Sequence, residues 1–400
     1  MFSAINLASW TKRLCQRSFT TDNTSGCYSL AGISRRSLLV MVVLPVGLLA
    51  SLALFCLLRQ AEWDKAESQF QPAAQDRSEV IAGAMDRSLF ALEAVSSFFE
   101  ASDRVDRERF QALVRPLLPR TLGLQAVEWV PRVPAANREA FEQQAGLNGL
   151  GRFVICEQDA AGHFVPATSR QEYFPRYYLA GNLGGQTAVG FDMNSDLLQR
   201  AALEKARDLG QLWVTAPMTG KNCLAVLPVY SKGQPVGTIE ERRRFLEGFI
   251  VGHIDPHRLV ETALNRLEPV GLDIYLYCSP APRDDRLIHF HSSRKRTSPG
   301  IPRDKEELHL SDALRMSACL PVGHQSWSVL ITPTEQFLAA RRSWWPWSAL
   351  GSGLIITLLL AACAAAATNR ASRVAGLVEE RTAQLVQSEE RVRRMADSAH

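Results

Sequence analysis

Two long runs without charge constrain this chain more than any other feature of its sequence. The run at 37–58 covers 22 positions and the run at 347–367 covers 21, and neither contains Asp, Glu, Lys or Arg. At about 1.5 Å of rise per helical residue, each run reaches the ~30 Å hydrocarbon thickness of a bilayer. We therefore predict two transmembrane helices, at 37–58 and 347–367. The alternative is a pair of long helices buried in a soluble core.

The first run has the features of an uncleaved membrane anchor. It is longer than the apolar region of a signal peptide, and no small-residue cleavage site follows it. Five basic residues and one acidic residue precede Ser37, in a polar tail at 1–36 without periodic pattern. Basic flanks remain in the cytoplasm, so we expect a multi-pass protein of the inner (plasma) membrane. Both termini are then cytoplasmic, and segment 59–342 is periplasmic or extracellular.

The 284 residues of segment 59–342 are enough for a large domain with its own core. Apolar residues recur at spacings of three and four from 61 to 99, which predicts a stalk helix. Short β-branched and aromatic runs then fall into two groups, at about 105–240 and about 245–335. A long helix followed by many short strands predicts an α+β fold with antiparallel sheets in two tandem subdomains.

Local signals place the individual elements. Asp106 is expected to cap a helix, and Ser195 or Asp196 to cap another at 197–209, which Gly210 ends. A further helix is predicted at 256–267, beginning at Pro256, and a turn at 219–222. Strands are predicted at 124–133, 151–158, 211–217, 223–231, 245–254, 272–278, 286–293 and 327–333.

The region after the second apolar run predicts a signalling helix at 370–394. A heptad register places Val378, Leu385 and Val392 at a, while Arg381 and Ser388 are polar residues at d. This pattern predicts a weak two-stranded coiled coil, and hence a homodimer through the stalk helix and the coiled coil. The alternative is a single solvated amphipathic helix.

Catalytic and metal-binding motifs are absent from the sequence. It contains no glycine-rich phosphate loop, no G-x-S-x-G, no H-E-x-x-H and no C-x-x-C, so we predict no catalytic residue and no cofactor. His253 and His257 are separated by Pro256 and would not share a helix face. His289 and His291 share a strand face but have no carboxylate or thiol beside them in sequence. We therefore expect surface histidines and no metal site.

The charge and cysteine content of the chain limit the kinds of binding partner that we expect. Lys and Arg number 45 against 41 Asp and Glu, a net charge of +4 that gives no sign of nucleic-acid binding. Cys156, Cys223, Cys278 and Cys319 fall in the outer segment, where three disulfide pairings or free thiols are all open. The partners expected are the membrane, a second copy of the chain and a small ligand.

A set of ordered stretches between residues 80 and 255 resembles the CHASE domain, the extracytoplasmic sensor of plant cytokinin receptors and many bacterial sensors. The set comprises LQAVEWVPRVPAANREAFE (124–142), RQEYFPRYY (170–178), GFDMNSD (190–196), ALEKARDLGQLWVTAP (202–217), LAVLPVYSKG (224–233) and RRRFLEGFIVG (242–252). The resemblance implies a stalk helix followed by two PAS-like subdomains, the distal one holding the ligand. The final residues, 388–400, resemble the start of a PAS domain.

The CHASE resemblance also implies ligand-binding residues. Asp192 corresponds to the family's ligand-binding aspartate, and Val214 and Thr215 to a pair that offers backbone groups. Tyr173, Phe174, Tyr177 and Tyr178 are candidates to line the pocket. The alternatives are that Asp192 caps the following helix or pairs with Arg200, and that the aromatic residues are plain core. An adenine-like compound or a peptide is the ligand implied.

The function that follows is a transmembrane receptor with a cytoplasmic output module. By analogy we expect a sensor histidine kinase of a two-component system, or alternatively a diguanylate cyclase or phosphodiesterase. A membrane-anchored extracytoplasmic enzyme is a third, disfavoured reading, since no clustered nucleophile, base or metal set is visible. A structural membrane protein without output is a fourth.

Overall fold

The computed structural model describes residues 35–102, 105–183, 189–217, 222–296 and 314–397. The chain divides into two compact units, one of Met1–Arg59 with Trp344–His400 and one of Gln60–Ser343, here called the sensor unit. The predicted tail lies outside the described residues up to position 34. Positions 219–221 of the predicted turn also lie outside them.

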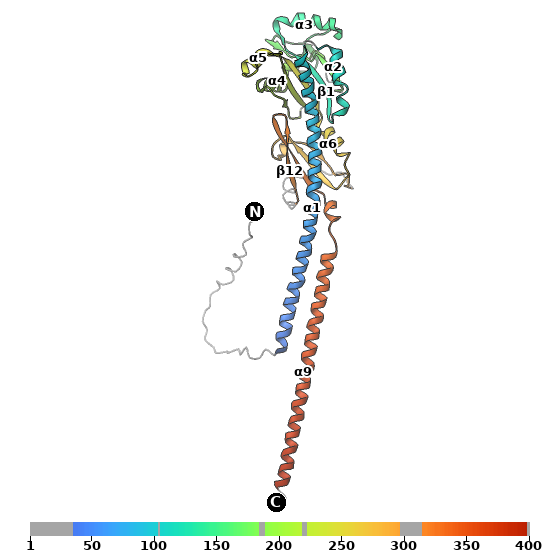
Figure 1. Cartoon of the computed structure of the whole chain (residues 1–400), viewed down its shortest axis with the longest axis vertical. Helices are drawn as coiled ribbons and strands as arrows, with labels where there is room; N and C mark the ends of the chain where they lie inside the picture. The colour runs from blue at the N-terminus through green and yellow to red at the C-terminus, as the bar shows by residue number, and fades with distance from the viewer. Residues whose placement is uncertain (1–34, 103–104, 184–188, 218–221, 297–313, 398–400) are drawn as a thin grey trace, which may run out of the picture. The chain divides into compact units, whose positions relative to one another are not determined.

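Two long helices contain the apolar runs. Helix α1 spans Arg35–Ala101, so the first predicted transmembrane segment and the stalk belong to one helix of 67 residues. Helix α9 spans Trp345–Asp397 and contains the second apolar run and the predicted signalling helix (Figure 1). Both have an apolar window long enough to cross a membrane, and most side chains in that window are exposed. These helices fit a membrane receptor by length and composition.

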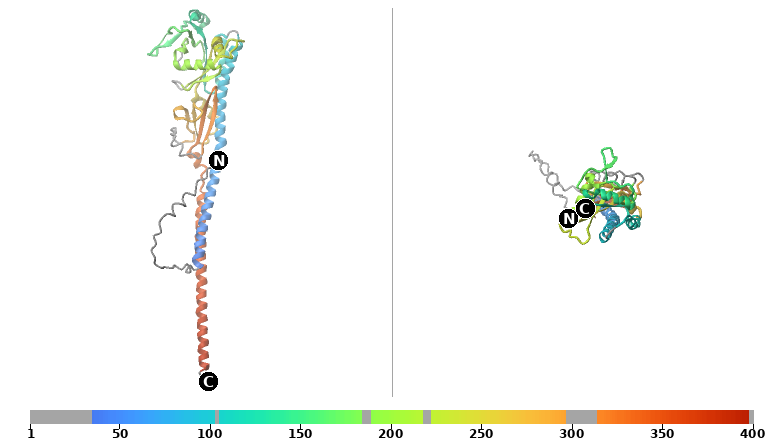
Figure 2. Two further views of the ribbon diagram at one scale, coloured as in Figure 1. Left: turned by 90° about the vertical axis from the view of Figure 1, so that its left-hand side faces the viewer. Right: turned by 90° about the horizontal axis from the view of Figure 1, so that it is seen from above.

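The sensor unit is built around two antiparallel sheets (Figures 1 and 2). The first sheet has five strands in the order β6-β1-β9-β8-β7, and the second has four in the order β11-β10-β13-β12. The first is formed by β1 (Leu124–Pro131), β6 (Tyr178–Gly181), β7 (Trp213–Val214), β8 (Cys223–Tyr230) and β9 (Leu246–Ile254). The second is formed by β10 (Leu272–Tyr277), β11 (Leu287–His291), β12 (Met316–Val322) and β13 (Gln325–Pro333).

Shorter elements surround the sheets. Two small antiparallel pairs are β2 (Val133–Pro134) with β5 (Glu172–Tyr173), and β3 (Cys156–Gln158) with β4 (Phe164–Pro166). The helices are α2 (Arg107–Val114), α3 (Arg138–Ala145), α4 (Leu197–Leu209), α5 (Ile239–Phe245), α6 (Pro256–Leu264) and α8 (Glu335–Ala339). Short helical turns include η5 (Gly146–Leu150) and η6 (Met193–Ser195).

Helix α1 supplies one side of the main core. Its buried residues Phe70, Ile81 and Leu92 belong to a cluster that also contains residues of both sheets. The Leu92 side chain of α1 packs against β9 at Gly252, where a β-carbon would come within 2.5 Å of it. A second cluster lies under α4 on the other face of the five-stranded sheet. The sheet therefore separates two cores.

The capping signals identified in the sequence are confirmed. The Asp106 side chain accepts from the Arg109 amide at the start of α2, and that of Asp196 accepts from the Gln199 amide at the start of α4. Gly210 ends α4 in the left-handed region with φ of 67°. Such signals are local hydrogen-bonding patterns, which explains why they can be recognised without knowledge of the tertiary fold.

Three sequence predictions differ from the structure. The strand predicted at 151–158 shortens to β3, because the chain still turns at Gly149 and Gly151, both of which have positive φ. Helix α6 ends at Leu264, three residues before the predicted end, with Asn265 as its C-cap. Strands β4, β5, β6 and β12 and helices α3, α5 and α8 were not predicted.

The histidine prediction needs a correction. His289 and His291 do not lie on the surface, because their side chains are only 9% and 8% exposed. The carboxylate that they lack in the sequence is supplied by Glu261 of α6, which packs beside β11. As predicted, Pro256 begins α6, so that His253 stays in β9 while His257 lies in the helix.

All the cysteines that the structure describes are free thiols. Cys223 is fully buried, Cys156 and Cys278 are partly buried, and Cys319 is exposed. Burial raises the pKa of Cys223 far above the ordinary thiol value, so this side chain behaves as a small apolar group.

Candidate functional site

The five-stranded sheet carries a buried charge on the face that points away from α1. Alternate residues of β1 point to opposite faces. Val127 and Trp129 pack in the core shared with α1, whereas Val130 belongs to the second core under α4. Glu128 lies on the same face as Val130 and is 0% exposed. A carboxylate in this position is costly unless it is paired, so its partners decide its role.

Two basic side chains face the Glu128 carboxylate. Arg176 Nε lies 3.1 Å from one carboxylate oxygen, and His253 Nε2 lies 3.2 Å from the other. His253 comes from β9, and the register places it two residues beyond the position opposite Glu128. All four atoms are buried, and among the described residues none completes a hydrogen bond of good geometry. We call these three residues the ionic cluster. Their charged atoms are within ion-pair distance, but the hydrogen bonds between them are poorly formed.

The predicted ligand residue Asp192 lies in a second, well-satisfied network. Its Oδ1 accepts hydrogen bonds from the amides of Phe174, at 2.8 Å, and Asn194, at 3.1 Å. Its Oδ2 lies 3.4 Å from Arg170 Nη1. Asp192 thus caps the short turn η6 and pairs with Arg170. The expected alternative pairing with Arg200 is wrong, because the Arg200 guanidinium donates to the Asn194 carbonyl.

The pKa values of the two buried carboxyls, Glu128 and Asp192, are shifted in opposite directions. Burial raises the pKa of Glu128, but the charges of Arg176 and His253 outweigh it and hold that pKa below its ordinary value. Burial also raises the pKa of Asp192, and here the backbone hydrogen bonds from Phe174 and Asn194 do not fully offset it. Perturbed pKa values of buried carboxyls are common at functional sites, where burial and charge partners are arranged to shift them.

Arg176 connects the two networks. Its guanidinium carbon lies 5.1 Å from the centre of the Phe191 ring, next in sequence to Asp192. Its backbone amide donates to the Phe191 carbonyl, and its backbone carbonyl accepts from Gly190. Cys156 of β3 completes the layer, since its carbonyl accepts from the Asp192 amide. The segments 170–178 and 190–196 therefore cover one face of the five-stranded sheet together.

Of the four predicted aromatic residues, Phe174 packs beside Asp192. The other three, Tyr173, Tyr177 and Tyr178, belong to the core shared with α1. Phe174 is buried in the core under α4, with its ring 5.4 Å from that of Phe249. Tyr173 belongs to the other core, and its hydroxyl donates to the Thr168 carbonyl at 3.2 Å. The Arg138 guanidinium lies over the Tyr173 ring at 4.9 Å. Phe174 and Tyr173 are thus neighbours in sequence that pack in different cores, and only Phe174 bonds Asp192.

The predicted pair, Val214 at the end of β7 and Thr215 directly after it, lies away from the ionic cluster. Val214 is fully buried in the core shared with α1, and its carbonyl accepts from Gln325 Nε2 at 2.8 Å. Thr215 bonds Leu224 of β8 twice, through its amide and its hydroxyl. The structure therefore gives both residues a strand-pairing role, and Asp192 and Phe174 are the predicted residues that it brings together.

The ionic cluster was missed by the sequence reasoning, although a signal was present. Glu128 interrupts a run of apolar and aromatic residues, and His253 ends the apolar run of β9. A lone charge within a buried strand is itself unusual, because charged residues are almost never fully buried unless paired. The partner Arg176 was quoted within the stretch 170–178 but not singled out.

Among the surface pockets in the described part of the sensor unit are three that neither Glu128 nor Asp192 lines. One of about 410 Å³ lies beside the C-terminal end of α1 and includes Glu100 and Lys232. Another of about 370 Å³ lies beside α3 and includes Glu139 and Arg152. The third is small and lies between α1 and the loop after α6. The side chains of Glu128, His253 and Arg176 are 0%, 7% and 11% exposed, so the ionic cluster is closed to solvent in this structure.

Comparison with protein families identifies the region. A model of the CHASE domain family matches residues 103–289, which contain the five-stranded sheet and both charged networks. The resemblance to CHASE-domain sensors expected from the sequence is confirmed.

Two curated proteins are similar over most of the chain. The hybrid signal transduction histidine kinase A of Dictyostelium discoideum is 23% identical over 354 residues, which cover 83% of this chain and 16% of that protein. The probable histidine kinase 4 of Oryza sativa subsp. japonica is 27% identical over 267 residues, which cover 64% of this chain and 23% of that protein. The chain thus spans less than a quarter of either relative.

A solved structure is also similar. The periplasmic sensory domain of a Campylobacter jejuni chemoreceptor is 11% identical and superposes with a TM-score of 0.41, covering 70% of this chain and 99% of that one.

Proposed function

Because residues 103–289 form a CHASE domain, we propose that this chain is the sensing half of a transmembrane signal receptor. The sensor domain lies in sequence between two helices that are long and apolar enough to cross a membrane. The basic flank before Ser37 favours cytoplasmic termini and a sensor outside the membrane. The two sheets, each antiparallel, are consistent with two tandem PAS-like subdomains.

The ionic cluster is the observation that carries the proposal of ligand binding. Burying Glu128, Arg176 and His253 without complete hydrogen bonds costs free energy that a purely structural core would avoid. A small ligand that presents both donors and acceptors would complete these bonds. Asp192 and Phe174 border the same face and would contact it from the covering segment. An adenine-like compound or a peptide has suitable groups.

The sheet offers a short route from the ligand face to α1. His253 points into the ionic cluster, and the preceding residue Gly252 lies against Leu92 of α1. A ligand that repositions His253 would therefore alter the β9–α1 contact on the other face. We propose that α1 and α9 pass this shift across the membrane in a homodimer, through the coiled coil at 370–394. The ligand shifts the equilibrium only by its differential affinity for the two states.

A histidine kinase is the output module that we favour. Both curated relatives carry that name, and each extends far beyond the region aligned here. A diguanylate cyclase or phosphodiesterase is the alternative. Transfer of labelled phosphate from ATP to a histidine of the natural full-length protein tests the first, and formation of a cyclic dinucleotide from GTP tests the second.

Ligand binding can be tested on the sensor unit, as residues 62–342. Thermal unfolding would be measured against adenine derivatives, amino acids, short peptides and carboxylates. A ligand at 100 times its Kd adds about 2.7 kcal/mol, which shifts Tm by a few degrees. Glu128→Gln and Asp192→Asn should abolish the shift, while Glu204→Gln, on the exposed face of α4, should leave it intact. A shift that survives both site variants would place the ligand elsewhere.

A further inference from the structure

Helix α6 and strand β11 bring four metal-ligating side chains together outside the ionic cluster. His257 and Glu261 are four residues apart in α6 and therefore lie on one face of the helix. His289 and His291 are two apart in β11 and therefore lie on one face of the strand. These four residues, here called the histidine cluster, come from segments about 30 residues apart in sequence.

The atoms of the histidine cluster are close enough to share one ion. His289 Nε2 and His291 Nδ1 lie 2.9 Å and 2.8 Å from the same Glu261 oxygen. His257 Nδ1 lies 3.1 Å from His289 Nδ1. Ligand atoms of His257, Glu261 and His289 all lie within 4.8 Å of one another. Ligands at ~2.0–2.1 Å from a tetrahedral ion stand about 3.3 Å apart, so His257, Glu261 and His289 need only small side-chain movements to share it. His291 lies outside this group of three and reaches it through Glu261, so its ring must turn toward the ion.

The surroundings favour an ion that enters from solvent. The imidazoles of His289 and His291 are nearly buried, the Glu261 side chain is 32% exposed, and His257 is exposed. Strand β11 thus supplies the two nearly buried ligands, and helix α6 supplies the two ligands that solvent can reach. Three imidazoles and one carboxylate are a donor set that suits zinc, whereas calcium and magnesium prefer oxygen alone.

We propose that the histidine cluster binds one divalent ion of the zinc class, held by His257, Glu261, His289 and His291. The ion replaces hydrogen bonds that now link these groups, and His289 gives up one of its two present partners to bind it. The site lies outside the face that we assign to the organic ligand. Its occupancy is therefore a second input to the sensor unit.

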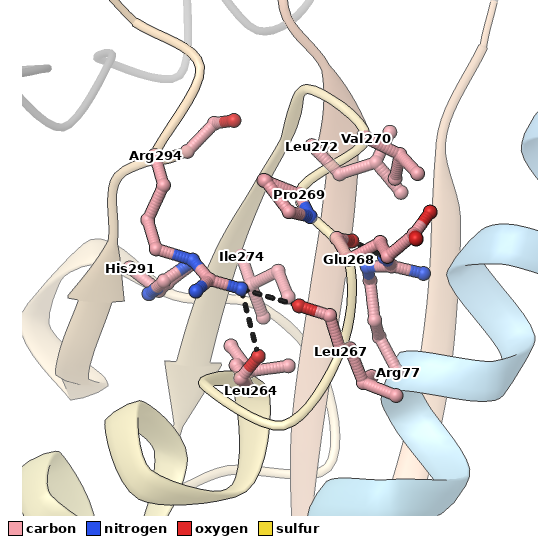
Figure 3. Close-up of a pocket in the computed structure, with 11 residues that line it drawn as sticks. Arg77, Leu264, Leu267, Glu268, Pro269, Val270, Leu272, Ile274, His291 and Arg294 are labelled. Carbon is pink, nitrogen blue, oxygen red and sulfur yellow. Dashed lines mark hydrogen bonds between the residues drawn. The ribbon is translucent and has the colours of Figure 1, made fainter.

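The position of the histidine cluster gives the ion a route to α1. His291 also lines the small pocket shown in Figure 3, together with Arg77 of α1 and Arg294. Arg77 Nη2 donates to the Glu268 carbonyl at 2.6 Å, in the loop that follows α6. The pocket has a volume of about 20 Å³, room for about one water. An ion that fixes α6 to β11 would thus stiffen the loop that holds α1.

The test uses the full chain in nanodiscs, purified without a polyhistidine tag and dialysed against EDTA. Calorimetric titration with zinc chloride should give one ion per chain. Titration with cobalt chloride should give the visible absorption bands of tetrahedral Co²⁺, which report nitrogen and oxygen ligation directly.

Variants separate the site from adventitious binding. His289→Gln with His291→Gln should abolish the cobalt bands, and His257→Gln, on the exposed side, should weaken binding at least tenfold without affecting folding. His163→Gln, at another exposed histidine, should bind as the wild type does. Absence of stoichiometric binding, or equal binding by His257→Gln and the wild type, would overturn the proposal and leave a hydrogen-bond network alone.

Discussion

Glu128 and Glu261 are two carboxylates that each face two basic groups, yet they differ in burial and in hydrogen bonding. Glu128 is 0% exposed and completes no hydrogen bond of good geometry among the described residues. Glu261 keeps about a third of its side chain in solvent and bonds two imidazoles at 2.8–2.9 Å. A carboxylate that faces two basic groups can therefore be fully enclosed, as Glu128 is, or within reach of solvent ions, as Glu261 is.

The largest effect should come from removing the guanidinium that faces Glu128. Arg176→Met is expected to destabilise the sensor unit by about 3–5 kcal/mol, because a buried charge loses its partner. Urea unfolding followed by circular dichroism would measure the loss. Adding Glu128→Gln should restore most of it. A single-variant loss below about 1 kcal/mol would mean that the cluster is hydrated, and the contrast with Glu261 would then disappear.

The second effect concerns the opposite face of the same sheet. Gly252→Ala should cost about 1–3 kcal/mol, because the new β-carbon overlaps the Leu92 side chain. The matched control is Gly237→Ala, whose β-carbon would meet Glu241 at an ordinary 3.6 Å. If both variants unfold at the same urea concentration, α1 does not press on β9 as described.

Removing one partner of the open carboxylate should cost less. His291→Gln, measured in EDTA, is expected to lower the free energy of unfolding by about 1 kcal/mol, because water can replace a hydrogen bond to the half-buried Glu261. A loss as large as that of Arg176→Met would show that exposure does not distinguish the two carboxylates.

The pH dependence distinguishes the two acids near the candidate ligand site. The folded-state pKa of Glu128 is lowered, so its contribution to stability is present above its unfolded pKa and is lost as the pH falls. The folded-state pKa of Asp192 is raised, so its ionisation opposes folding as the pH rises. Between about pH 3 and 6, Glu128→Gln should therefore flatten the rise of stability with pH, and Asp192→Asn should steepen it. Equal slopes in both variants would contradict these assignments.

An exposed ion pair provides the lower limit of the series. Arg109 and Asp106 are 3.6 Å apart, with side chains 67% and 57% exposed. Arg109→Gln should change the free energy of unfolding by less than about 0.5 kcal/mol, since solvent and salt screen such pairs. The Asp106 cap bonds the backbone amide and stays in place. A loss above 1 kcal/mol would indicate that the α2 region tolerates little change.

The sequence was sufficient to predict elements whose ends or apolar pattern are marked by their own residues. Helix α4 was predicted with its bounds, because Asp196 and Gly210 mark its ends. Strands β8 and β9 were recognised from their apolar runs. Strand β12 was not, because a short edge strand that contains Pro321 has little pattern of its own and forms by pairing with β13.

The charged sites were harder to predict, because tertiary packing assembles them. Asp192 was identified by family resemblance. Glu128 and His253 are 125 positions apart and meet through the pairing of β1 with β9. Glu261 meets His289 and His291 only after α6 packs beside β11. No spacing rule within the sequence encodes these contacts.

Because Gly252 has no side chain, Leu92 of α1 lies directly against the backbone of β9. One peptide bond separates the residue that faces Leu92 from the residue that faces Glu128. A shift of His253 on one face of the sheet therefore needs to pass through only one peptide unit to reach the Leu92 contact on the other. Any side chain larger than hydrogen at this position would act as a wedge between β9 and Leu92, and under the proposed mechanism it would bias the sensor unit toward one of its two states with no ligand bound.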